Sequence, residues 1–223
     1  RFHLAVVAAE NPRGNQDLLS VLAAGRLAPG RIYLNRLAQI NNGTVFSRVA
    51  GVALGDRYTA NLRHDLNSGS LHVPLTSTRR QPFGTREVQV TPLAARMVDS
   101  ALNNVGTYGV RFDVNLNLTG RGHHQLVMSH PVVSGKKTFT AFRGSIRIQT
   151  GQKVRDVHVG LRSGESLALS DLHLQSGMDQ PVRVSLVYPA DATPGHLLSV
   201  VPVTQLALLH QRQLNLQRTQ DSI

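Results

Sequence analysis

The alternation of side chains over residues 182–188 constrains the fold of this chain more than any other feature. The even-numbered positions hold the apolar residues Val182, Val184, Leu186 and Tyr188, and Arg183 and Ser185 lie at odd-numbered positions between them. A period of two is that of a half-buried β-strand. Two prolines, at 189 and 194, bracket the residues that follow, and a second apolar run comes after them. The pattern therefore predicts a strand, a rigid turn and another strand.

The same period recurs through the second half of the chain. The clearest example is residues 108–119, where every second side chain is apolar. Further strands are predicted at 123–130, 139–150, 154–161, 167–174 and 197–201. Turn residues separate these strands about every 8 to 14 positions, a spacing typical of an all-β sandwich and not of βαβ units. We predict an antiparallel β-sandwich with Greek-key or jelly-roll-like connections.

The first half of the chain has a less regular pattern. Residues 44–53 and 58–62 are predicted to pair as a hairpin, because Gly55-Asp56 separates two alternating runs. Residues 71–75 are predicted to form an edge strand, since Pro74 lacks the N–H that a central strand needs. One or two short helices are predicted, at 16–24 and 93–102.

The sandwich domain is predicted to span residues 1–202. Its first strand begins almost at residue 1, and we interpret this abrupt start as the C-terminal part of a longer chain. Residues 203–223 form a glutamine-rich tail, interpreted as either helical or flexible. In the helical interpretation, three leucines would dock on a partner or on the sandwich itself: Leu206, Leu209 and Leu214.

The charge of the chain is strongly positive, with a formal net charge of +11 and a pI of about 11.3. Lysine occurs only at positions 136, 137 and 153, so arginine carries nearly all of the positive charge. Arginine suits the binding of carboxylate, phosphate or sulfate groups through its planar fork. A GC-rich genome, which favours arginine codons, explains the excess equally well.

Three arginines form the candidate binding site. Arg143 and Arg147 share the polar parity of one predicted strand, and Arg183 has the same role in another. If these strands are neighbours, three guanidinium groups gather on one sheet face. The alternative is an ordinary solvated face. Nucleic acid is not predicted as a partner, because aromatic residues make up only 4% of the chain. No apolar run is long enough for a membrane span.

No catalytic or cofactor site is predicted. The chain has no cysteine, which excludes disulfides and thiolate metal ligands. His124 and His130 share a strand face but lie about 20 Å apart along it, too far to bind one metal ion. No metal site is therefore predicted, and the histidines are interpreted as surface or core residues. No nucleophile motif is present, and the carboxylates form no obvious pair.

Five short segments, taken in order, resemble a family of proteins. They are residues 48–52, 106–110, 142–147, 157–161 and 186–194. Together they resemble the C-terminal portion of a cyanobacterial family, domain of unknown function 3370. The resemblance implies a cyanobacterial source, a longer precursor, and export to the periplasm or cell envelope. It supplies no catalytic residues.

Three functions remain open from the sequence. The first is a non-catalytic structural or adaptor module that binds an acidic protein surface, as a subunit of a larger complex. That complex would lie in the cell envelope or in a thylakoid or cytoplasmic membrane assembly. The second is a cell-envelope module that binds an anionic polysaccharide. The third is a hydrolase of unknown substrate.

Overall fold

The computed structural model describes residues 49–79, 85–96, 100–131, 138–189 and 192–205. The chain divides into two compact units, one of residues 1–51 with 95–101 and one of residues 52–94 with 102–223. Few residues of the first unit are described; within it, the backbone N–H of Ala50 donates to Ser100 Oγ at 2.9 Å. The second unit holds the sandwich and the candidate site.

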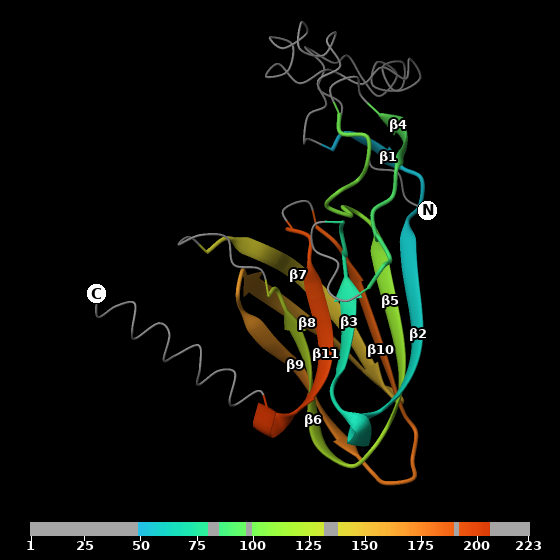
Figure 1. The fold of residues 1–223 in the computed structure, drawn as a ribbon, viewed down its shortest axis with the longest axis vertical. Coiled ribbons are helices and arrows are strands. Elements are labelled where there is room, and N and C mark those ends of the chain that lie inside the picture. Colours follow the sequence, from blue (N-terminus) through green and yellow to red (C-terminus); the bar gives the residue numbers. More distant parts are fainter. Residues whose placement is uncertain (1–48, 80–84, 97–99, 132–137, 190–191, 206–223) are drawn as a thin grey trace, which may run out of the picture. The chain divides into compact units, whose positions relative to one another are not determined.

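Two sheets form the sandwich (Figure 1). In spatial order, the five-stranded sheet consists of β2 (Arg57–Asp65), β5 (Arg111–Thr119), β10 (Gln180–Val187), β7 (Thr140–Thr150) and β8 (Lys153–Arg162). The four-stranded sheet consists of β3 (Leu71–Leu75), β11 (His196–Pro202), β6 (Gly122–Ser129) and β9 (Ser166–Leu174). A 3-10 turn, η1 (Leu66–Ser68), follows β2, and β1 (Gly51–Ala53) pairs with β4 (Leu93–Arg96) in a separate two-stranded sheet.

The all-β sandwich predicted from the sequence is confirmed. The six strands predicted after residue 108 correspond to β5, β6, β7, β8, β9 and β11, and the opening alternation corresponds to β10. β3 lies at one edge of its sheet, as Pro74 requires. β10 and β11 belong to opposite sheets, so the proline-bracketed segment crosses from one layer to the other.

Two local predictions were wrong. Of the hairpin predicted from residues 44–53 and 58–62, the described residues 49–53 and 58–62 pair elsewhere: β2 lies parallel to β5, with Tyr58 opposite Phe112, and β1 pairs with β4. Alternation alone cannot choose a strand's partner, which here comes from far along the chain. The segment 93–102 was predicted to be a helix, but its first residues form strand β4. Pairing of β4 with β1 overrides the helix propensity of Leu-Ala-Ala-Arg.

Two other expectations lie outside the described residues. They are the helix at 16–24 and the tail leucines Leu206, Leu209 and Leu214. Residues 203–205, which follow β11, are helical, and Ser70 Oγ donates to Gln205 Oε1 at 2.8 Å.

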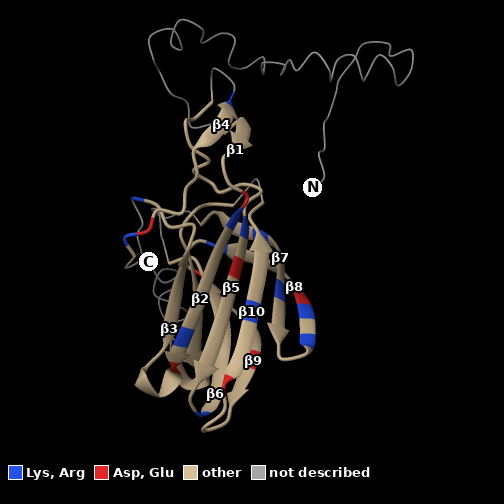
Figure 2. Cartoon of the chain, turned by 90° about the vertical axis from the view of Figure 1, so that its right-hand side faces the viewer, with Lys and Arg blue, Asp and Glu red and all other residues tan. Residues whose placement is uncertain are grey.

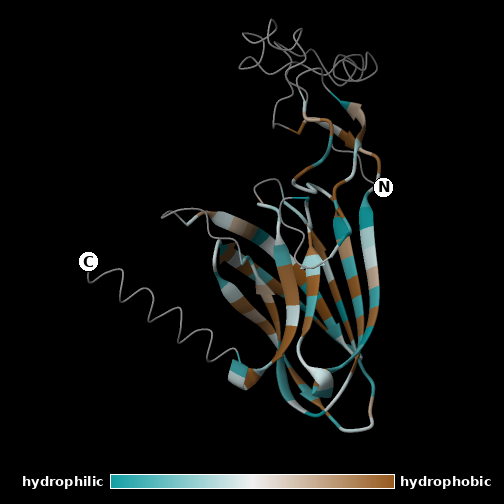
Figure 3. Ribbon diagram, viewed as in Figure 1, coloured by the Kyte–Doolittle hydropathy of each residue, from teal (hydrophilic) through white to brown (hydrophobic). Residues whose placement is uncertain are grey.

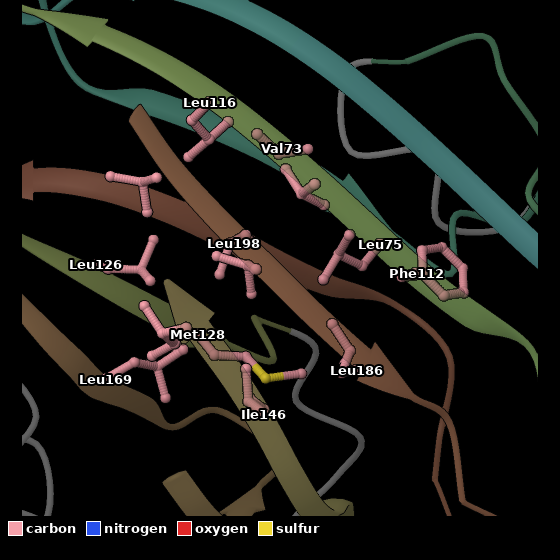
Figure 4. Packing of buried hydrophobic residues seen from close by; sticks show 14 of the residues in the cluster. Val73, Leu75, Phe112, Leu116, Leu126, Met128, Ile146, Leu169, Leu186 and Leu198 are labelled. Atoms are coloured by element: carbon pink, nitrogen blue, oxygen red, sulfur yellow. The ribbon is translucent and has the colours of Figure 1, made fainter. Parts of the chain in front are cut away.

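The hydrophobic core lies between the two sheets. In Figure 3 the strands carry alternating brown and teal bands, as expected where one face of each sheet is buried. Figure 4 shows Leu126 and Leu198 of one sheet packing toward Ile146 and Leu186 of the other. These four side chains are at most 3% exposed, and each such burial contributes about 1.5–3 kcal/mol.

The parity of β10 fixes which residues face outward. Val182, Val184 and Leu186 are buried in the core, so Arg183 and Ser185 must lie on the outer face of the five-stranded sheet. The register aligns Ser185 with Asp113 on β5 and with Arg147 on β7. The core alternation therefore places a row of polar side chains across the outside of this sheet.

Candidate functional site

The three arginines of the predicted site lie on one face of the five-stranded sheet. β7 and β10 are antiparallel neighbours, and Arg143, Arg147 and Arg183 all have outward parity. Figure 2 shows basic positions in blue and acidic positions in red along the strands of this sheet. Arg147 and Arg183 are diagonal neighbours across the two strands, about 7–8 Å apart at Cα. Arg143 is four residues from Arg147 on the same strand, about 13 Å away. The three guanidinium groups therefore spread along the face.

An open groove of about 420 Å³ lies on this face between β5 and β8. Its lining residues are Arg111, Ser145, Arg147, Asp156, His158, Ser185, Leu186 and Val187. The strand registers align polar side chains across this face in two rows. One row runs over four strands and consists of Asp113, Ser185, Arg147 and Asp156, and the other consists of Ser145 and His158. Of the three predicted arginines, only Arg147 lines this groove. Arg183 lines a smaller depression of about 110 Å³ with Asn115 and Gln149.

Arg147 and Asp156 form the main ion pair of the groove. Arg147 Nε and Nη2 donate to the two carboxylate oxygens of Asp156, each at 2.8 Å. These hydrogen bonds and the charge of Arg147 hold the pKa of Asp156 below its ordinary value, and the same contacts raise the pKa of Arg147. Both side chains are well exposed, at 63% for Arg147 and 45% for Asp156.

Asp113 holds the other arginine of the groove. Its Oδ1 accepts from Ser185 Oγ at 2.6 Å and from Arg111 Nε at 2.9 Å, and Arg57 Nε lies 3.5 Å from Oδ2. Burial raises the pKa of Asp113, but the Ser185 and Arg111 hydrogen bonds and the two positive charges outweigh it, so the pKa lies below its ordinary value. One carboxylate thus orders two arginines and a serine.

Asp113→Asn is expected to destabilise the sandwich by about 1–3 kcal/mol, because it removes charge-assisted hydrogen bonds from a nearly buried position. The destabilisation is measured by urea unfolding at neutral pH. It should shrink as the pH falls, because a lowered folded-state pKa contributes full stability above the unfolded-state pKa and loses it as the pH falls through the folded-state pKa. A loss that stays constant down to pH 2 would contradict this account.

Ser145 and His158 form a hydrogen-bonded pair that the sequence reasoning missed. Ser145 Oγ lies 2.7 Å from His158 Nδ1, and Asp156 is two residues away on the same strand. A hydrolytic triad needs Nε2 facing the serine and a carboxylate on Nδ1. Here Ser145 Oγ is hydrogen-bonded with Nδ1 of His158, and the Asp156 carboxylate is bound by Arg147. The arrangement offers hydrogen-bonding groups to a ligand and differs from that of a triad.

A polar ladder extends the face beyond the groove. Arg183 Nε donates to Asn115 Oδ1 at 2.9 Å, and Asn115 Nδ2 donates to Asn61 Oδ1 at 2.8 Å. Asp179 accepts from Asn117 Nδ2 at 2.9 Å and pairs with Arg63 at 3.5 Å. Arginine and asparagine side chains therefore cover this end of the sheet. Strand pairing, invisible in a single sequence, brings them together.

Two histidines lie in the core. His130 and His196 are fully buried, with ring centroids 5.0 Å apart, and Tyr188 OH lies 3.2 Å from His196 Nδ1. Burial lowers the pKa of His196 to about 3, with repulsion from His130 adding to the effect and a hydrogen bond with the backbone of Ala141 opposing it. Burial raises the pKa of Tyr188 far above its ordinary value. His124 is also buried.

In the described ranges, no group of three or more His, Asp or Glu side chains is arranged to hold a metal ion. His123 stacks on His173 with centroids 4.1 Å apart, beside Asp171. Among the helices of the described parts, none is long and apolar enough to cross a membrane.

The tyrosines offer no exposed aromatic platform in the described part of the chain. Tyr188 is 1% exposed, and Tyr58 stacks on the core residue Phe112 with centroids 5.1 Å apart. Tyr108 is half-buried, and Tyr33 lies outside the described residues.

The sequence was compared with known families, curated proteins and solved structures. No curated protein and no solved structure shows a significant match. Residues 2–202 match a family described as protein of unknown function (DUF3370), which covers most of the chain. This extent of match shows that the chain belongs to the DUF3370 family.

Proposed function

We propose that the protein is a non-catalytic adaptor module that binds an acidic protein through the outer face of its five-stranded sheet. One observation carries the proposal: this face holds the arginine-lined groove and its polar ladder. Its arginines, which outnumber its carboxylates, are Arg57, Arg63, Arg111, Arg143, Arg147 and Arg183, against Asp65, Asp113, Asp156 and Asp179. With a net charge of +11, the chain attracts acidic surfaces over long range.

A protein partner agrees with the chemistry of the face better than a polysaccharide does. Sugar-binding sheets commonly present aromatic side chains for stacking, but here Tyr58 and Tyr188 pack into the core. The groove combines arginine, serine and histidine with the half-exposed Val187, a mixture suited to acidic side chains with aliphatic stems. An anionic polysaccharide remains the alternative ligand.

The charged and hydrogen-bonding side chains of the groove support a binding role. Their arrangement differs from a Ser-His-Asp triad, because Ser145 contacts Nδ1 of His158 and Arg147 binds Asp156. The complex is proposed to lie in a cell envelope or a photosynthetic membrane assembly, which is what the sequence resemblance implies.

Removing the three predicted arginines is expected to weaken binding to poly-L-glutamate by roughly threefold to a hundredfold, since each exposed contact is worth about 0.2–1 kcal/mol. The variant is Arg143→Gln/Arg147→Gln/Arg183→Gln. Its control is Arg79→Gln/Arg86→Gln/Arg121→Gln, which has the same net charge and exposed arginines outside this sheet. Binding is measured by calorimetry at low salt and repeated at high salt.

The proposed function fails if both triple variants bind poly-L-glutamate like the wild type. It also fails if the wild-type chain prefers alginate, an anionic polysaccharide, and this preference survives in the face variant. Equal losses in the two variants would show a general charge effect and not a defined surface.

A further inference from the structure

The two arginines of the groove are each held by a carboxylate, but the two carboxylates differ in exposure. The Asp113 side chain, which holds Arg111, is 12% exposed and also accepts from Ser185. The Asp156 side chain, which holds Arg147, is 45% exposed. Solvent therefore reaches one ion pair readily and is largely kept from the other.

This difference makes the Arg147–Asp156 pair exchangeable. Exposed ion pairs contribute little to folding, because water and salt compete for both charges. Arg147 uses Nε and Nη2 to hold Asp156, the same fork through which arginine binds any carboxylate. A carboxylate from outside can take over these two N–H groups at small cost to the fold. To bind Arg111 in the same way, an outside carboxylate would have to displace Asp113. The Asp113 carboxylate is held by Arg111, Ser185 and Arg57.

We propose that Asp156 is an internal competitor for Arg147, and that a carboxylate side chain of the acidic partner displaces it on binding. The inference rests on the proposed function and names the entering group as an aspartate or glutamate side chain. Val187, which is 51% exposed and lines the groove, provides an apolar contact for its aliphatic stem. Because each incoming carboxylate competes with a tethered one, the groove favours partner segments that present several acidic side chains together.

Asp156→Asn tests the proposal against a matched control. The probe is a ten-residue peptide of alternating glutamate and glycine, with its glutamine counterpart as the uncharged reference. Asp156→Asn is expected to tighten binding of the acidic peptide by about threefold to fivefold, and Arg147→Gln to weaken it by at least as much.

The control, Asp171→Asn, makes the same charge change at an exposed carboxylate of β9, in the other sheet. Because Asp171 lies outside the proposed binding face, the affinity of this variant should change by less than about 1.5-fold at 0.1 M salt.

A second readout follows the exchange directly. In nuclear magnetic resonance spectra of the wild-type chain, the acidic peptide should shift the Arg147 Nε–Hε signal and leave that of Arg111 in place. The inference is overturned if Asp156→Asn behaves like Asp171→Asn or binds more weakly while the triple arginine variant still loses binding. If the wild-type chain does not bind the acidic peptide at all, both this inference and the proposed function fail.

Discussion

Tyr188→Ala is expected to destabilise the sandwich by about 3–5 kcal/mol, the usual cost of deleting a large buried aromatic side chain. Tyr188 follows β10 and is 1% exposed. Its ring lies 5.1 Å from that of Phe112, 5.5 Å from that of Phe142 and 5.5 Å from that of His196. These neighbours come from both sheets, so the cavity would open where the two layers meet. Urea unfolding followed by far-ultraviolet circular dichroism measures the loss.

Tyr188→Phe is the matched control, because it keeps the ring and removes only the hydroxyl group. It should cost about 1–2 kcal/mol, since the lost contact to His196 Nδ1 is a single buried hydrogen bond. If alanine and phenylalanine destabilise equally, the hydroxyl and not the ring would dominate at this position. The description of Tyr188 as a packing residue between the sheets would then be wrong.

The stability of the sandwich is expected to fall steeply on acidification because His196 is buried in its neutral form. Its folded-state pKa is about 3, well below the value of about 6.5 expected in the unfolded chain. Between these values the unfolded chain binds a proton that the folded chain does not, so stability falls as the pH falls. The slope from this residue approaches about 1.4 kcal/mol per pH unit, giving a total on the order of 4 kcal/mol.

His196→Leu isolates this contribution from that of other titrating groups. Unfolding free energies measured from pH 7 down to pH 3.5 should depend less on pH in His196→Leu than in the wild type. The groups that face His196 are His130, Tyr188 and Thr76. Carboxylates with a lowered pKa, such as Asp113, also contribute to the acid slope, so part of it should remain in His196→Leu. An unchanged slope in His196→Leu would contradict neutral burial.

The strands of the second half of the chain were predictable because apolar and polar side chains alternate along a half-buried strand. β5 and β10 alternate cleanly, and their core-facing positions follow from parity, although Asp113 on the polar parity of β5 is also buried. Strand partners were not predictable. The parallel pairing of β2 with β5 joins residues far apart in the sequence, and nothing in the pattern of residues 57–65 specifies it. The β4 segment has helix-forming residues, and only its pairing with β1 makes it a strand.

For the candidate site, the sequence predicted only which side of its strand each arginine occupies. Arg143, Arg147 and Arg183 could be assigned to the polar side of their strands, and the pairing of β7 with β10 then places them on one face. The groove itself was not foreseen. Arg111, Ser145, Asp156 and His158 meet there through the registers of β5, β7 and β8, which depend on core packing between distant segments. An adjacent serine and histidine on paired strands left no signal in the linear sequence.

Capture of partners from an extract of the source cells tests the central claim most directly. The baits are the wild-type chain, the face variant Arg143→Gln/Arg147→Gln/Arg183→Gln, and the equal-charge control Arg79→Gln/Arg86→Gln/Arg121→Gln. At low salt, the wild type and the control should retain the same acidic protein, identified by mass spectrometry, and the face variant should not. High salt should release it from both. Retention by all three baits, or recovery of glycan in place of protein, would contradict an acidic-protein surface on the five-stranded sheet.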